Sequence, residues 1–106
     1  RGLIGAAKIK TITVEAIQRA VAEHFDVRIS DLRGRSRERQ VAYPRQIAMY
    51  LTRQLIPSLS LKEIGQAFGD KHHTTVLYAC QQVTEELARD DAVRVLLQQL
   101  EKAIRS

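Results

Sequence analysis

The stretch SLKEIGQAFGDKHHTTVLYAC, from Ser60 to Cys80, contains the signals of a short helix, a tight turn and a longer helix. Ser60 and Glu63 have the spacing of a capping box, which starts a helix, and Gly69 supplies the left-handed residue that ends it. A four-residue turn, 69–72, leads into the second helix. The apolar faces of the two helices are Leu61, Ile64 and Phe68, then Val76, Ala79, Cys80, Val83 and Leu87. This order predicts a helix-turn-helix.

Helical spacing also occurs before this motif. Thr13 is a good N-cap for a first helix over residues 14–25. Residues 30–32 indicate one short helical turn, and residues 33–40 (RGRSRERQ), which hold no apolar side chain, predict an exposed loop. The apolar stripe of the first helix consists of Val14, Ile17, Val21 and Phe25.

Two further long helices complete the prediction. Pro44 lacks an N–H donor and restricts the residue before it, so one helix either starts or bends there, and Pro57 ends it. Asp90 or Asp91 caps the last helix. The two stripes are Val41, Pro44, Ala48, Leu51 and Leu55, then Val93, Leu96, Leu97, Leu100 and Ile104. No stretch alternates convincingly as a strand, so the predicted class is all-α with about six helices.

Length and composition limit what the chain can do. Its 106 residues suffice for one domain. The opening RGLIGAAKIK lacks the spacing of a phosphate-binding loop, so we expect neither a cofactor nor catalysis here. The single cysteine excludes an internal disulfide and fits a reducing cytosol. No apolar run reaches the length of a membrane span.

The net charge of +5 comes from one part of the chain. Residues 28–53 hold seven arginines against two acids, whereas the remaining residues carry ten basic and ten acidic side chains. The seven are Arg28, Arg33, Arg35, Arg37, Arg39, Arg45 and Arg53. A confined basic stretch predicts a polyanion on one surface; the alternative is a solvated arginine-rich loop.

The residues at the start of the second helix suit base reading. In a helix-turn-helix these positions meet base edges, and here they are Lys71, His72, His73, Thr74 and Thr75. Lysine donates to guanine, while threonine and imidazole offer both polar and apolar contacts. Adjacent histidines diverge and no second cysteine is available, which disfavours a metal site. Nothing places Asp70 against a histidine, which disfavours catalysis. A helical hairpin that merely packs is the remaining alternative.

Two separated motifs resemble the C-terminal domain of the DnaA family, the bacterial chromosome replication initiators. IGQAFGDKHHTTVLYAC (64–80) is similar to the family signature, and YPRQIAMYL (43–51) to its Pro-Arg-Gln segment. VEAIQRAVAEHFDV is similar to the opening helix, and the resemblance covers roughly residues 12–104. It implies a Trp-repressor-like helix-turn-helix domain over residues 12–106. Residues 1–11 would be the linker from a missing N-terminal ATPase domain.

The resemblance also implies how DNA is contacted. The major-groove positions correspond to Lys71, His73, Thr74 and Thr75. Arg37 corresponds to the arginine that enters the narrow minor groove of an A·T-rich flank. The positions that contact the DNA backbone correspond to Arg45, Gln46 and Arg53, and we expect Arg39 of the same basic stretch to anchor the DNA with them. His72 departs from the family's usual aspartate, which accepts from a cytosine; a neutral imidazole still accepts, whereas a protonated one does not.

The implied target is the DnaA box, a repeated element of the replication origin, bound in the bacterial cytoplasm. The resemblance implies a domain that is monomeric in isolation and a parent protein that self-assembles on the origin. Regulator proteins or acidic phospholipids are further possible partners. Two other functions stay open. A helix-turn-helix transcription regulator predicts a dimer on a palindromic site. A protein- or lipid-docking module predicts binding to anionic vesicles and little preference among DNA sequences.

Overall fold

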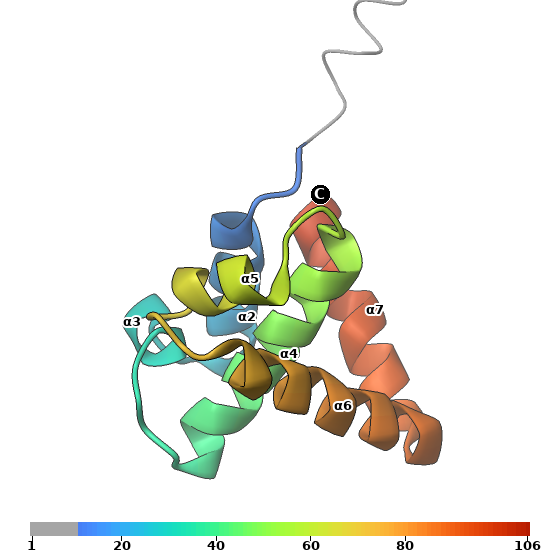
Figure 1. Ribbon diagram of the computed structural model, residues 1–106. Coiled ribbons are helices and arrows are strands. Elements are labelled where there is room, and N and C mark those ends of the chain that lie inside the picture. The colour runs from blue at the N-terminus through green and yellow to red at the C-terminus, as the bar shows by residue number, and fades with distance from the viewer. Residues whose placement is uncertain (1–10) are drawn as a thin grey trace, which may run out of the picture.

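A computed structural model describes residues 11–106, and this part of the chain contains helices and no strand. The helices are α2 (Val14–Phe25), α3 (Ile29–Leu32), α4 (Arg39–Leu55), α5 (Leu61–Ala67), α6 (His73–Arg89) and α7 (Asp91–Arg105). The predicted all-α class is therefore confirmed. Apart from Thr11, the expected linker lies outside the described residues. Figure 1 shows α4 in the middle of the molecule, where it contacts each of the other helices.

The first helix, α2, forms over the predicted residues because both of its ends are capped. Thr13 Oγ1 accepts from the backbone N–H of Ala16 at 3.1 Å. Asp26 ends the helix in the left-handed conformation, with a φ of 55°. The buried face of α2 packs against α4 and α7 and consists of Ile17, Gln18, Val21 and Ala22. One residue of that buried face, Gln18, is polar.

The central helix, α4, begins earlier than predicted. It starts at Arg39, so a start at Pro44 is wrong, and the predicted loop over residues 33–40 ends two residues sooner. Pro44 lies inside the helix and cannot donate to the carbonyl of Gln40. The first turn forms nevertheless, because the Glu38 carbonyl accepts from two backbone N–H groups of that turn at 2.7 and 3.0 Å.

The helix-turn-helix forms as predicted from α5, a turn and α6, but the turn has five residues, 68–72, because α5 ends at Ala67 and the turn begins one residue earlier than predicted. Ser60 Oγ accepts from the Glu63 N–H at 3.0 Å, and Glu63 Oε1 accepts from the Ser60 N–H at 2.9 Å, which confirms the capping box. Gly69 adopts a φ of 87°, as the turn requires. Gly65 permits close packing, because a Cβ there would lie 2.1 Å from the Lys71 carbonyl oxygen.

The last helix, α7, closes the core. Asp90, one of the two predicted caps, accepts from the Ala92 N–H at 2.9 Å. The buried side chains of α7 are Val93, Leu97, Leu100 and Ile104, and the helix packs against α2, α4 and α6. Residues 11–106 contain no helix that is both long and apolar enough to span a membrane.

Candidate nucleic-acid interface

The first turn of α6 presents three polar side chains to solvent: His73, Thr74 and Thr75 are all exposed. His72, just before them, is the N-cap of the helix. Its Nδ1 accepts from the Thr74 N–H at 3.2 Å and lies 2.7 Å from Thr74 Oγ1. The His73 ring lies against that of His72, with 4.3 Å between centroids. His72 therefore starts the helix that carries the other three side chains.

Lys71, expected among the base-reading residues, folds back onto the protein. Its Nζ donates to the Phe68 carbonyl at 2.6 Å and to the Arg33 carbonyl at 3.3 Å. Burial lowers the pKa of the Lys71 amine, and the charges of Arg45 and Arg35 lower it further. The amine thus ties the turn before α6 to residues 33–38, which we call the arginine loop.

Arg45, expected to anchor the DNA backbone, is buried with 7% of its surface exposed. Its Nε donates to the Leu32 carbonyl at 3.2 Å. Its Nη1 donates to the Ser36 carbonyl at 2.8 Å, and its Nη2 to the Asp31 carbonyl at 2.7 Å. Burial lowers the pKa of Arg45. The guanidinium therefore holds the end of α3 and the arginine loop against α4.

Two residues that were not among the predicted site residues also hold the arginine loop and the turn before α6 together. Gln18 is fully buried; its Oε1 accepts from Arg33 Nη2 at 3.1 Å, and its Nε2 donates to the Ala67 carbonyl at 3.1 Å. A Cβ on Gly69 would lie 2.0 Å from the Arg33 carbonyl oxygen, so the loop and the turn are in direct contact. The sequence could have predicted that Gln18 is buried, because this glutamine stands four residues after Val14, on the apolar face of α2.

The other predicted anchoring residues have different environments. Arg37 is exposed in the arginine loop, and Gln46 is half-buried on α4. Arg39 pairs with Glu86 at 3.8 Å, and its guanidinium carbon lies 4.7 Å from the centre of the Tyr43 ring. The remaining one, Arg53, is exposed on the last turn of α4, beside Cys80 of α6.

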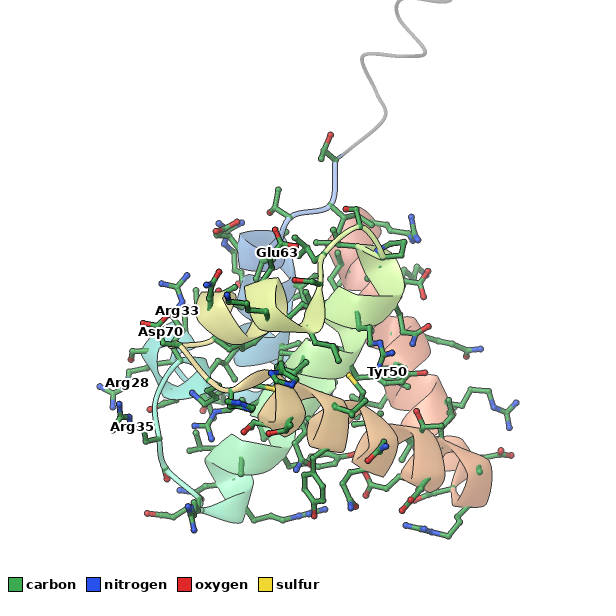
Figure 2. The ribbon with its side chains drawn as sticks, in the orientation of Figure 1. Arg28, Arg33, Arg35, Tyr50, Glu63 and Asp70 are labelled. Atoms are coloured by element: carbon green, nitrogen blue, oxygen red, sulfur yellow. The ribbon has the colours of Figure 1, made fainter. Side chains whose placement is uncertain are left out.

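The basic surface extends beyond the predicted residues. Figure 2 shows Arg28, Arg33 and Arg35 on one side of the molecule, around α3 and the arginine loop, with Asp70 close by. Arg28 forms an ion pair with Asp31 at 3.6 Å, but 83% of its side chain remains exposed. In the part of the chain described here, no three His, Cys, Asp or Glu side chains gather as metal ligands.

The chain matches known proteins over most or all of its length. Residues 14–83 match the family described as the bacterial dnaA protein helix-turn-helix. The chain is 42% identical over all 106 residues to the chromosomal replication initiator protein DnaA of Symbiobacterium thermophilum, and it spans 23% of that protein. A solved structure described as a DNA replication initiation factor superposes with a TM-score of 0.72 at 35% identity, over 86% of this chain and 28% of the other. The chain belongs to the bacterial DnaA helix-turn-helix family.

Proposed function

We propose that this domain binds double-stranded DNA at DnaA boxes of a bacterial replication origin, in the initiation of chromosome replication. The start of α6 enters the major groove, and the arginine loop enters the adjacent minor groove. The observation that carries the proposal is the direct connection between these two elements. Lys71 of the turn donates to the Arg33 carbonyl of the loop, so exposed His73 and exposed Arg37 belong to one framework.

Family membership and charge support the proposal. The S. thermophilum relative is named a chromosomal replication initiator. The whole net charge of +5 arises within residues 28–53, which include the arginine loop, and a confined basic surface favours a polyanion. The domain binds DNA without catalysing a reaction, and the ATP-dependent steps and self-assembly on the origin belong to the longer parent protein.

We assign the expected DNA-contacting residues three roles: contacts to bases, contacts to phosphates, and support of the residues that make those contacts. Bases are contacted by His73, Thr74 and Thr75 in the major groove and by Arg37 in the minor groove; the phosphate contacts come from Arg39, Gln46 and Arg53. Lys71 and Arg45 hold these residues in place, because their polar atoms are engaged within the protein, and Nδ1 of exposed His72 caps the helix that carries three of them. Arg39 binds DNA after exchanging its ion pair with Glu86 for a phosphate.

The proposal is tested by fluorescence anisotropy on a DnaA-box duplex and a scrambled duplex, each at two salt concentrations. The wild-type chain should prefer the box. His73→Ala and Arg37→Ala should each weaken box binding by about 1–3 kcal/mol and scrambled binding much less. His24→Ala is the matched control, because His24 is exposed at the end of α2, outside this surface. Equal, steeply salt-dependent binding to both duplexes would leave only a basic domain without sequence preference.

A further inference from the structure

Tyr78 is the most exposed large apolar side chain in the described part of the chain, with 56% of its surface accessible. It lies on α6, within the second turn of the helix that starts with His73. No hydrogen bond or ring contact engages Tyr78 among residues 11–106. By contrast, the Tyr43 ring packs edge-on against Phe25, 6.0 Å between centroids. Tyr78 is thus available for an intermolecular contact.

The position of Tyr78 on the helix gives the direction of that contact. Residues four apart lie on the same face of an α-helix, separated by about 6 Å along its axis. Tyr78 therefore follows Thr74 on one face. The buried stripe of α6, which consists of Val76, Ala79, Cys80 and Val83, lies on the opposite face. A DNA duplex that follows this face of α6 beyond Thr74 meets Tyr78 next.

The side chains that follow Tyr78 on the same face are polar. The next exposed outward residue after Tyr78 is Gln81, which is neutral, and Glu85 follows one turn later. The Glu85 carboxylate would repel phosphates. Tyr78 is consequently the large apolar side chain on this face between Thr74 and Glu85. A phenol ring between threonine hydroxyls and an acid is suited to an apolar contact inside a groove, where thymine presents its 5-methyl group.

We infer that Tyr78 is a further specificity-determining residue, whose ring packs against the 5-methyl group of one thymine in the major groove. This inference rests on the proposed function. It assigns α6 a base contact one helical turn beyond Thr74. The phenol hydroxyl is not needed for the contact, so phenylalanine should replace tyrosine, whereas alanine should not.

The test combines protein and DNA substitutions. Tyr78→Phe and Tyr78→Ala are measured by anisotropy on the box duplex, on the scrambled duplex, and on box duplexes in which each thymine in turn becomes uracil. That change removes one methyl group and nothing else. Val95→Ala is the control, because Val95 is 50% exposed on α7. Circular dichroism confirms that each variant is folded.

At one position, uracil should weaken wild-type and Tyr78→Phe binding about fourfold, the value of one buried methyl group. The same uracil should leave Tyr78→Ala unaffected, because the partner ring is already gone. If the wild-type chain prefers the box but every uracil weakens wild-type and Tyr78→Ala binding equally, the inference about Tyr78 is wrong and the proposed function still stands. Equal weakening of box and scrambled duplexes by Tyr78→Ala would also overturn the inference about Tyr78. A wild-type chain without box preference would overturn both this inference and the proposed function.

Discussion

Replacing Arg45 with methionine should destabilise the domain without removing a phosphate contact. The substitution deletes three hydrogen bonds from a charged donor, at 2.7, 2.8 and 3.2 Å, and leaves three backbone carbonyls without that partner. One such bond contributes about 1.5–3 kcal/mol. Two of the three are only partly buried, so water replaces them in the variant. We expect a loss of about 3 kcal/mol in the free energy of unfolding, since such contributions do not add fully.

A loss of this size leaves a domain of ordinary stability folded at 25 °C but lowers its Tm by roughly 15 °C. Box binding at 25 °C should also weaken, because the arginine loop is no longer held in position. The dependence of binding on salt should stay the same, because a buried guanidinium releases no counterion from DNA. Thermal unfolding and anisotropy titrations at several salt concentrations measure the two effects on one sample.

Arg53→Met is the matched comparison, since Arg53 is an exposed arginine on the same helix. If Arg53 contacts a phosphate, its loss reduces the slope of log K against log salt concentration by about 0.9 and changes Tm little. The two variants should therefore have opposite signatures. An Arg45→Met variant with unchanged Tm and a lower salt slope would refute the assignment of Arg45 to the loop.

Three further predictions concern the framework of the site. Gly69→Ala should lower the urea midpoint strongly, because its Cβ would meet the Arg33 carbonyl at a positive φ; an unchanged midpoint would contradict this. Hydrogen bonds from Ser60 lower the pKa of Glu63, so stability should fall as the pH drops through that lowered pKa, and Glu63→Gln should reduce the fall. Burial raises the pKa of Cys80, so iodoacetamide at pH 8 should label it only after unfolding.

The helices and their ends could be predicted from the sequence because their causes are local. Thr13, Ser60 with Glu63, and Asp90 each cap a helix through an N–H within three residues of their own position. Apolar spacing indicated the buried faces, and Gly69 the turn. The start of α4 was harder to predict, because a charged stretch without apolar residues does not show where its helical part begins.

The direction of the polar side chains was decided only by the tertiary structure. Lys71 meets a carbonyl 38 residues away, and Gln18 meets one 49 residues away. Arg45 has the sequence position of a DNA-contacting residue, but the carbonyls of α3 and the arginine loop surround it. The sequence by itself determined the helix-turn-helix, its family and the basic stretch. The sequence did not show which Lys and Arg side chains face solvent and which bind the arginine loop. Long flexible side chains donate to whichever acceptors the packed helices bring within reach, and those acceptors come from segments distant in the sequence.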